Sequence, residues 1–221
     1  MRIMRPTLGQ GNLMHDTYLY RNITISGLPG SGSTTLLDSL REALKFDGWM
    51  GYNGGGYMRE FAKKQGLLDV KGELHHSAGA YPDDFDLQVD MDMRTKLQQE
   101  SRWILESWLS GFLAQQIPGT LKILMRCSDK SVRVDRIVNR DGVTPDEAIA
   151  NMNYRYEVNA QKWRRMYKQQ WDEWVVKPGT MRPSDPIDFW HQGLYDLVID
   201  TYMSNQQDSL EQVVHAITQK K

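Results

Sequence analysis

The sequence predicts an α/β fold with a mainly parallel sheet, and three observations support this prediction. Short β-branched runs alternate along the chain with longer segments whose apolar residues recur at helical spacing. A glycine-rich stretch separates the first such run from the first helix. The 221 residues include 40% hydrophobic and 25% charged side chains, which suits a globular chain with one sizeable core. Alternating strands and helices are typical of a parallel sheet covered by helices.

In the first half of the chain, RNITISG (residues 21–27) is a β-branched run that ends at a glycine and is predicted to be a buried strand. TTLLDSLREALKF follows with the apolar spacing of a helix. After a run of glycines, a helical pattern begins at Tyr57. DFDLQVDMDMRTKLQQESR predicts another helix, because its apolar residues fall four apart. WILESWLSGFL and TLKILMRCS are apolar runs that we interpret as inner strands.

In the second half, SVRVDRIVNRDG predicts a helix that ends at Gly142. The next helix is expected to begin after Thr144, since Pro145 and Glu147 complete a typical N-terminal capping pattern. It is expected to continue through WDEW. VVKPGTMRPSDPIDFWHQG (residues 175–193) contains three prolines and predicts a long surface loop, whose Trp190 and His191 either pack or cover a ligand. YDLVIDT predicts a last strand and SLEQVVHAITQK a terminal helix.

Composition limits the classes of partner and location. The net charge of −1 gives no general electrostatic case for a nucleic-acid or membrane partner. No run reaches the roughly 18 apolar residues of a membrane span. Cys127, the single cysteine, excludes an internal disulfide and is expected to be a buried thiol, which suits a reducing, cytoplasmic setting. Residues 1–19 are interpreted as a flexible arm, and residues 20–221 as one domain.

ISGLPGSGSTT has the pattern of a phosphate-binding loop, G-x-x-x-x-G-K-[ST], except that Ser33 stands at the lysine position. In such loops the backbone N–H groups surround the phosphates, and a hydroxyl such as that of Thr34 binds Mg²⁺. The pattern predicts binding of ATP and Mg²⁺; a plain strand-to-helix turn is the alternative. The predicted nucleotide-contacting residues are Gly27, Pro29, Gly30, Ser31, Gly32, Ser33, Thr34 and Thr35.

Two basic helix faces follow later in the chain. Arg133, Arg136 and Arg140 share one face, and Arg155, Asn159 and Lys162 share a face of the next helix; they are either two solvated surfaces or a clamp that closes over phosphates.

Five segments follow one another in a fixed order and span most of residues 23–201: ITISGLPGSGSTT, GGGYMREFAKKQG, WILESWLSG, RVDRIVNRDGVTPDEAI with NYRYEVNAQKWRRMY, and YDLVIDT. Together they resemble nucleoside monophosphate kinases, and among them the small archaeal-type cytidylate kinases. The resemblance implies a P-loop NTPase fold, a three-layer α/β/α sandwich. It implies a helical acceptor-binding insert at about residues 51–97 and a lid at about residues 129–168. The implied activity is transfer of the ATP γ-phosphate to CMP or dCMP.

The resemblance also implies roles for single residues. Arg59 matches the arginine that holds the acceptor monophosphate. Arg136, Arg140 and Arg155 match the lid arginines that neutralise the transferring group, so one of them is a candidate substitute for the missing lysine. Glu106 either orders Mg²⁺ through water or caps the loop.

Trp108 stands where the family has an arginine that contacts the acceptor phosphate, and it either stacks on a base or packs in the core.

Other interpretations stay open. The chain is alternatively a catalytically impaired nucleotide-binding protein, or a P-loop kinase of another small acceptor; nucleic-acid binding through the second basic helix is a remote third. A monomer with small-molecule substrates and no membrane partner is expected. His75 and His76 are interpreted as a polar loop and not a metal site. The aspartates of residues 83–92 are interpreted as a solvated helix side, or alternatively as contacts to the sugar or base of an acceptor.

Overall fold

The computed structural model describes residues 18–57 and 83–218, and its strands form a five-stranded sheet in the order β2-β3-β1-β4-β5. Every pair of neighbouring strands is parallel. The strands are β1 (Asn22–Gly27), β2 (Met50–Asn53), β3 (Trp103–Glu106), β4 (Thr120–Arg126) and β5 (Leu197–Asp200). The helices are α1 (Ser33–Leu44), α3 (Asp83–Gln99), α4 (Ser110–Leu113), α5 (Lys130–Asp141), α6 (Pro145–Met166), α7 (Lys168–Trp171) and α8 (Gln206–Thr218).

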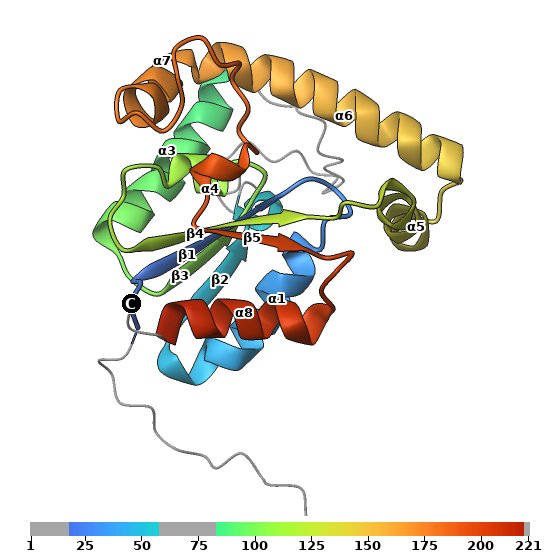
Figure 1. Cartoon of the computed structure of the whole chain (residues 1–221), viewed down its shortest axis with the longest axis horizontal. Helices are drawn as coiled ribbons and strands as arrows, with labels where there is room; N and C mark the ends of the chain where they lie inside the picture. The colour runs from blue at the N-terminus through green and yellow to red at the C-terminus, as the bar shows by residue number, and fades with distance from the viewer. Residues whose placement is uncertain (1–17, 58–82, 219–221) are drawn as a thin grey trace, which may run out of the picture.

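Helices cover both faces of the sheet, which confirms the predicted three-layer α/β/α fold. Figure 1 shows α1 and α8 on one face and α3, α4 and α7 on the other. Side chains alternate along β1: Ile23 and Ile25 enter the core beneath α1 and α8. Ser26 faces the opposite layer, where its hydroxyl accepts a hydrogen bond from the backbone N–H of Gly111 just inside α4. Because both faces are buried, β1 contains no exposed position.

The second core lies under α3, α4 and α7, and it corrects one prediction. Residues 175–193 were expected to form a surface loop, yet Val175 and Phe189 within them are fully buried. The Phe189 ring packs edge-on against Phe112 of α4, with 4.8 Å between ring centroids. The three prolines interrupt regular structure between Val176 and Gln192, but the apolar side chains of the segment still fill the space beside α4 and α7.

The ends of the helices agree with the predicted ends where the sequence contains a capping signal. Gly142 ends α5 in the left-handed conformation, and Thr144 and Glu147 form a complete capping box at the start of α6. The predicted long helix ends earlier than expected, at Met166, and continues as α7 and a π-helical turn, Asp172–Val176.

Two strand predictions need correction. β2 was not predicted, because this edge strand is short, contains a glycine and pairs only with β3. The apolar run after β3 was expected to be all strand, but residues 110–113 are helical.

The predicted lid, residues 129–168, corresponds mainly to α5 and α6. Val134, Ile137 and Ala148 form a small hydrophobic cluster between these helices, separate from the two cores beside the sheet. Figure 1 shows the pair extending away from the sheet. Movement of this pair stays a prediction.

The predicted insert and arm fall partly outside the described residues: 58–82 of the insert and 1–17 of the arm. Within the part of the arm that the structure describes, the Tyr18 hydroxyl donates to Asp47.

Candidate functional site

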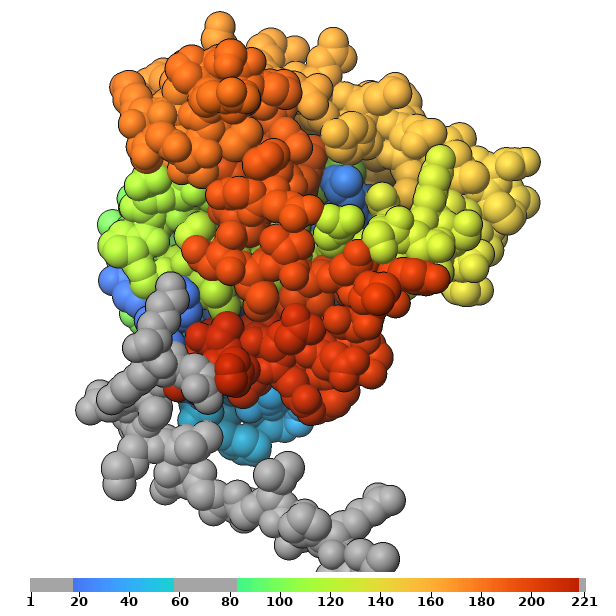
Figure 2. Space-filling view, in the orientation of Figure 1, coloured from blue at the N-terminus to red at the C-terminus, as the bar shows by residue number. Residues whose placement is uncertain are grey.

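A cleft of about 680 Å³ opens at the carboxyl ends of the parallel strands. β1 leads directly into the glycine loop (residues 27–35), and β3 ends at Glu106, so both deliver polar groups to this edge. In Figure 2 the blue atoms of the loop are visible between gold α6 and the red and orange segments from the C-terminal part of the chain. The lining includes Gly27, Pro29, Gly30, Gly32, Ser33, Thr34, Thr35, Glu106, Trp108, Arg136, Arg140, Arg155 and Thr201.

The backbone of the glycine loop takes conformations that suit an anion cradle. Gly30 and Gly32 have φ of 80° and 89°, in the left-handed region that favours glycine. A Cβ at Gly30 would lie 2.8 Å from the carbonyl oxygen of Arg133, so this loop packs tightly against α5. α1 begins immediately after Gly32, and its first N–H groups add to the positive potential there. The loop therefore fits phosphate oxygens.

Ser33, at the lysine position of the pattern, is paired with an acidic residue. Its hydroxyl donates to Oε1 of Glu106 at 2.7 Å, and both residues are buried. Burial raises the pKa of Glu106, and the hydrogen bond from Ser33 only partly opposes this. A cation near this carboxylate would favour its charged form. A metal ion beside the Ser33–Glu106 pair would therefore stabilise the ionised form of Glu106.

Arg155 and Arg140 form the opposite wall of the cleft. Burial, and then the charge of Arg140, lower the pKa of Arg155. The Nε of Arg155 is buried without a hydrogen-bond partner, and its guanidinium lies 5.4 Å from the ring centre of Trp108. Arg140 is held by Asp141, with Nε to Oδ1 at 2.6 Å. An anion between the two arginines would relieve their repulsion.

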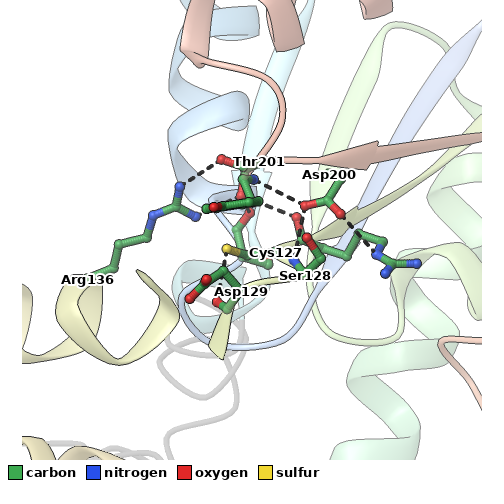
Figure 3. Close-up of polar contacts among 9 residues, drawn as sticks. Cys127, Ser128, Asp129, Arg136, Asp200 and Thr201 are labelled. Carbon is green, nitrogen blue, oxygen red and sulfur yellow. Dashed lines mark hydrogen bonds and ion pairs between the residues drawn. The ribbon is translucent and has the colours of Figure 1, made fainter. Parts of the chain in front are cut away.

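Arg136 contacts the loop through Thr201, the residue after β5. Its Nη1 donates to the Thr201 hydroxyl at 2.7 Å and to the Gly30 carbonyl at 3.0 Å, and its Nη2 donates to the Thr201 carbonyl. The Thr201 hydroxyl in turn donates to the Ser31 carbonyl at 3.0 Å. Figure 3 shows Arg136 and Thr201 pointing toward one another. Arg136 therefore supports the loop as well as lining the cleft.

Trp108 is half-buried at the cleft and belongs to an aromatic cluster. Its ring meets Trp163 of α6 edge-on at 5.6 Å and Trp190 at 6.2 Å. The indole N–H of Trp190 also donates to the Trp108 carbonyl at 3.0 Å. Of the two alternatives for Trp190, packing is the one observed, while Trp108 both packs and faces the cleft.

The interpretation of the α3 aspartates as a solvated side is wrong for Asp86 and Asp90. Asp86 accepts from Lys162 at 2.7 Å, and Asp90 accepts from the Tyr167 hydroxyl. Burial raises the pKa of Asp90 to about 7. Residues three and four apart shared a face as expected, but that face meets α6 and not solvent.

The structure brings together all but two of the predicted site residues. Ser31 is 2% exposed and does not line the cleft; its backbone N–H closes a turn with Leu28. Arg59 lies outside the described residues, as do His75 and His76.

Sequence reasoning missed Thr201 and residues 204–206, which also line the cleft. A signal existed, because this polar run follows a strand of a parallel sheet directly.

Three further features of the described residues concern Cys127, clusters of metal ligands and membrane spans. Cys127 is buried, as expected, with its Sγ 3.4 Å from the Asp129 carbonyl oxygen (Figure 3). Across residues 18–57 and 83–218, no three His, Cys, Asp or Glu side chains gather to hold a metal. In the same part of the chain, no helix combines the length and apolar character needed to cross a membrane.

Comparison with known proteins gives the family of the chain and its relatives. A family model described as an AAA domain matches residues 23–174. A cytidylate kinase of Methanothrix thermoacetophila is 31% identical over 195 residues, covering 88% of this chain and 96% of that protein. One of Methanosarcina barkeri is 30% identical over 190 residues, covering 86% and 92%. A solved structure of an uncharacterized protein from Eubacterium ventriosum shares the fold, with a TM-score of 0.60 at 16% identity over 90% of this chain and 99% of that one.

Proposed function

Because this chain belongs to the AAA domain family and groups with the archaeal cytidylate kinases, we propose that it transfers the γ-phosphoryl group of ATP to CMP or dCMP. The observation that supports this most is the meeting of the glycine loop, Glu106 and three arginines in one cleft. Phosphoryl transfer needs alignment and charge neutralisation more than covalent chemistry, and these residue types supply both.

The nucleotide side of the site uses backbone groups. The N–H groups of the glycine loop and of the first turn of α1 hold the phosphates of ATP. Mg²⁺, when bound, neutralises charge on the phosphates; Thr34 would hold it directly and Glu106 through water. Ser33 adds a hydroxyl and no positive charge, so neutralisation depends on the arginines.

The acceptor side depends on the lid. Arg140 and Arg155 compensate the charge that spreads over the transferring group. Arg136 donates to the Gly30 carbonyl and so supports the loop, and it is our candidate to substitute for the missing lysine. We assign the acceptor phosphate to Arg59 by its match to the family motif.

The test is release of ADP with ATP, Mg²⁺ and each of CMP, dCMP, UMP, AMP and GMP, beside a reaction without acceptor. We expect turnover with CMP or dCMP. Arg155→Ala should lower kcat by roughly 10³-fold or more, since an arginine on the transferring group has effects of this size in related enzymes. Arg182→Ala is the matched control, because Arg182 is exposed and pairs only locally with Asp185.

Two outcomes would contradict the proposal. If the protein binds ATP but turns over none of the five acceptors, the alternative of a catalytically impaired nucleotide-binding protein is favoured. In that case Ser33→Lys is informative, because a gain of transfer would identify the missing ammonium as the cause. Equal turnover of the Arg155→Ala and Arg182→Ala variants would show that Arg155 does not act on the transferring group.

A further inference from the structure

A group of polar side chains lies buried between α3 and α6. Figure 1 shows the position of these two helices. Lys162 contacts Asp86 at 2.7 Å and Asp83 at 3.4 Å. The side chains of Lys162 and Asp86 are only 9% and 12% exposed. Desolvation offsets much of the attraction in such a pair, so stability alone is a weak reason for it.

Two oxygen atoms in this group have no hydrogen-bond partner. Asp86 uses Oδ2 for Lys162, whereas its Oδ1 is buried and unpartnered. Asn159 is 6% exposed, and its Oδ1 is also buried and unpartnered. Buried hydrogen-bond acceptors normally have a donor. Each missing hydrogen bond costs free energy, which a donor on a ligand would recover.

The geometry of α6 connects these acceptors to the cleft. Arg155, Asn159 and Lys162 are four and three residues apart, so they share one face of the helix. Arg155 lines the cleft, and Lys162 reaches α3. Asn159 lies between them, about 6 Å along the helix axis from Arg155. This face therefore leads from the phosphate end of the cleft to Asp86.

We propose that Asp86 and Asn159 contact the base of the acceptor nucleotide and select one with an amino group beside an unprotonated ring nitrogen, as cytosine has at N4 and N3. The inference rests on the proposed function, which supplies the nucleotide acceptor. An amino group offers the N–H donors that two unpartnered oxygens require.

The two residues have different parts in this selection. A carboxamide carries both an acceptor and donors and turns over readily, so Asn159 pairs with the matching edge of cytosine or of uracil. An ionised carboxylate only accepts. Burial raises the pKa of Asp86, and the contact with Lys162 opposes this by favouring the ionised form. Asp86 thus accepts from the amino group of cytosine and repels the O4 carbonyl of uracil. Asp86 determines specificity, and Asn159 contributes affinity.

The experiment compares equilibrium binding and kcat/KM for CMP, UMP and dCMP in four proteins: wild type, Asp86→Asn, Asn159→Ala and Asp84→Asn. Asp84 is an exposed residue of the same helix and serves as the matched control. Asp86→Asn should lower the CMP to UMP preference by roughly 10-fold to 100-fold, the usual effect of one polar base contact. Asn159→Ala should weaken CMP and UMP by similar factors, and Asp84→Asn should change neither. Thermal melting of each variant checks that it is folded.

Three results would overturn the inference. The first is a wild-type protein that does not prefer CMP to UMP, and the second is an unchanged preference in folded Asp86→Asn. The third is a change confined to the CMP to dCMP ratio, which would place the oxygens of Asp86 and Asn159 at the sugar. The proposed function fails separately. If CMP binds in preference to UMP, Asp86→Asn removes the preference, and no protein transfers a phosphoryl group, the inference holds and the transfer proposal does not.

Discussion

Single residues in the cleft show how its charges are balanced. Ser33 leaves the glycine loop without the ammonium of the usual pattern, and its hydroxyl instead donates to Glu106. Burial raises the pKa of Glu106 and lowers that of Arg155 on the opposite wall. Without a ligand, burial therefore disfavours the charged forms of both Glu106 and Arg155. A magnesium nucleotide would supply a cation to the first residue and anionic oxygens to the second.

Glu106→Gln tests the first half of this balance. The variant keeps the shape of the side chain and removes its charge, so we expect kcat/KM to fall by roughly 10-fold to 100-fold, as for other residues that orient metal ligands. Glu211→Gln, on the exposed side of α8, is the control.

The pH profile of kcat/KM gives a second readout of the same residue. With ATP as the varied substrate, kcat/KM reports the enzyme without bound nucleotide or metal, in which burial raises the pKa of Glu106. The ionised form is the active one, so activity is lost as pH falls through this raised pKa, at a higher pH than for an ordinary glutamate. The Gln variant should lack this acid limb. An identical acid limb in both proteins would assign it to another group.

Among the elements, α6 links the cleft to α3. It contributes Arg155 to the cleft, Trp163 to the aromatic cluster and Lys162 to α3. Its first turn projects beyond the sheet and is held by the capping box of Thr144 and by the small cluster shared with α5. Local stability at this end therefore depends on few contacts.

Thr144→Ala should loosen the first turns of α6 without unfolding the domain. Loss of an N-cap costs about 1 kcal/mol, which corresponds to roughly fivefold faster amide exchange. Hydrogen exchange of residues 148–152 measures the change. Thr95→Ala is the control, because Thr95 bonds only to its own helix. Equal exchange in wild type and Thr144→Ala would show that the cluster with α5 alone holds this end.

At the scale of the whole molecule, residues 175–193 join two parts of the fold. Phe189 contacts Phe112 of α4 and Trp171 of α7, and Trp190 contacts Trp108 at the cleft. The core beside α3 thus continues into the wall of the functional site. Stability and site geometry are coupled through this segment.

Phe189→Ala should destabilise the entire domain. Truncating a fully buried phenylalanine costs about 3–5 kcal/mol, and Tm should fall by about 10 °C in a chain of this size. Phe46→Ala is the control, since Phe46 is 90% exposed and should leave Tm unchanged. A Tm within about 2 °C of wild type for Phe189→Ala would mean that the segment is peripheral to folding.

Local signals in the sequence account for much of the fold and the glycine loop. β-branched runs, helical spacing, Gly142 and the Thr144 box placed most elements correctly, because each acts over a few neighbouring residues. Gly30 and Gly32 marked the loop for the same reason: positive φ is a local requirement. The arginines were found through their helical spacing and their match to a family motif.

Tertiary contacts account for the remainder. The pairing of Asp86 with Lys162 spans 76 residues, and that of Thr201 with Ser31 spans 170. Neither follows from a pattern in its own segment. The edge strand β2 and the buried Phe189 likewise depend on partners distant in the chain. Hydrophobic burial is non-directional, so the face of α3 that meets solvent is settled only when α6 packs against it.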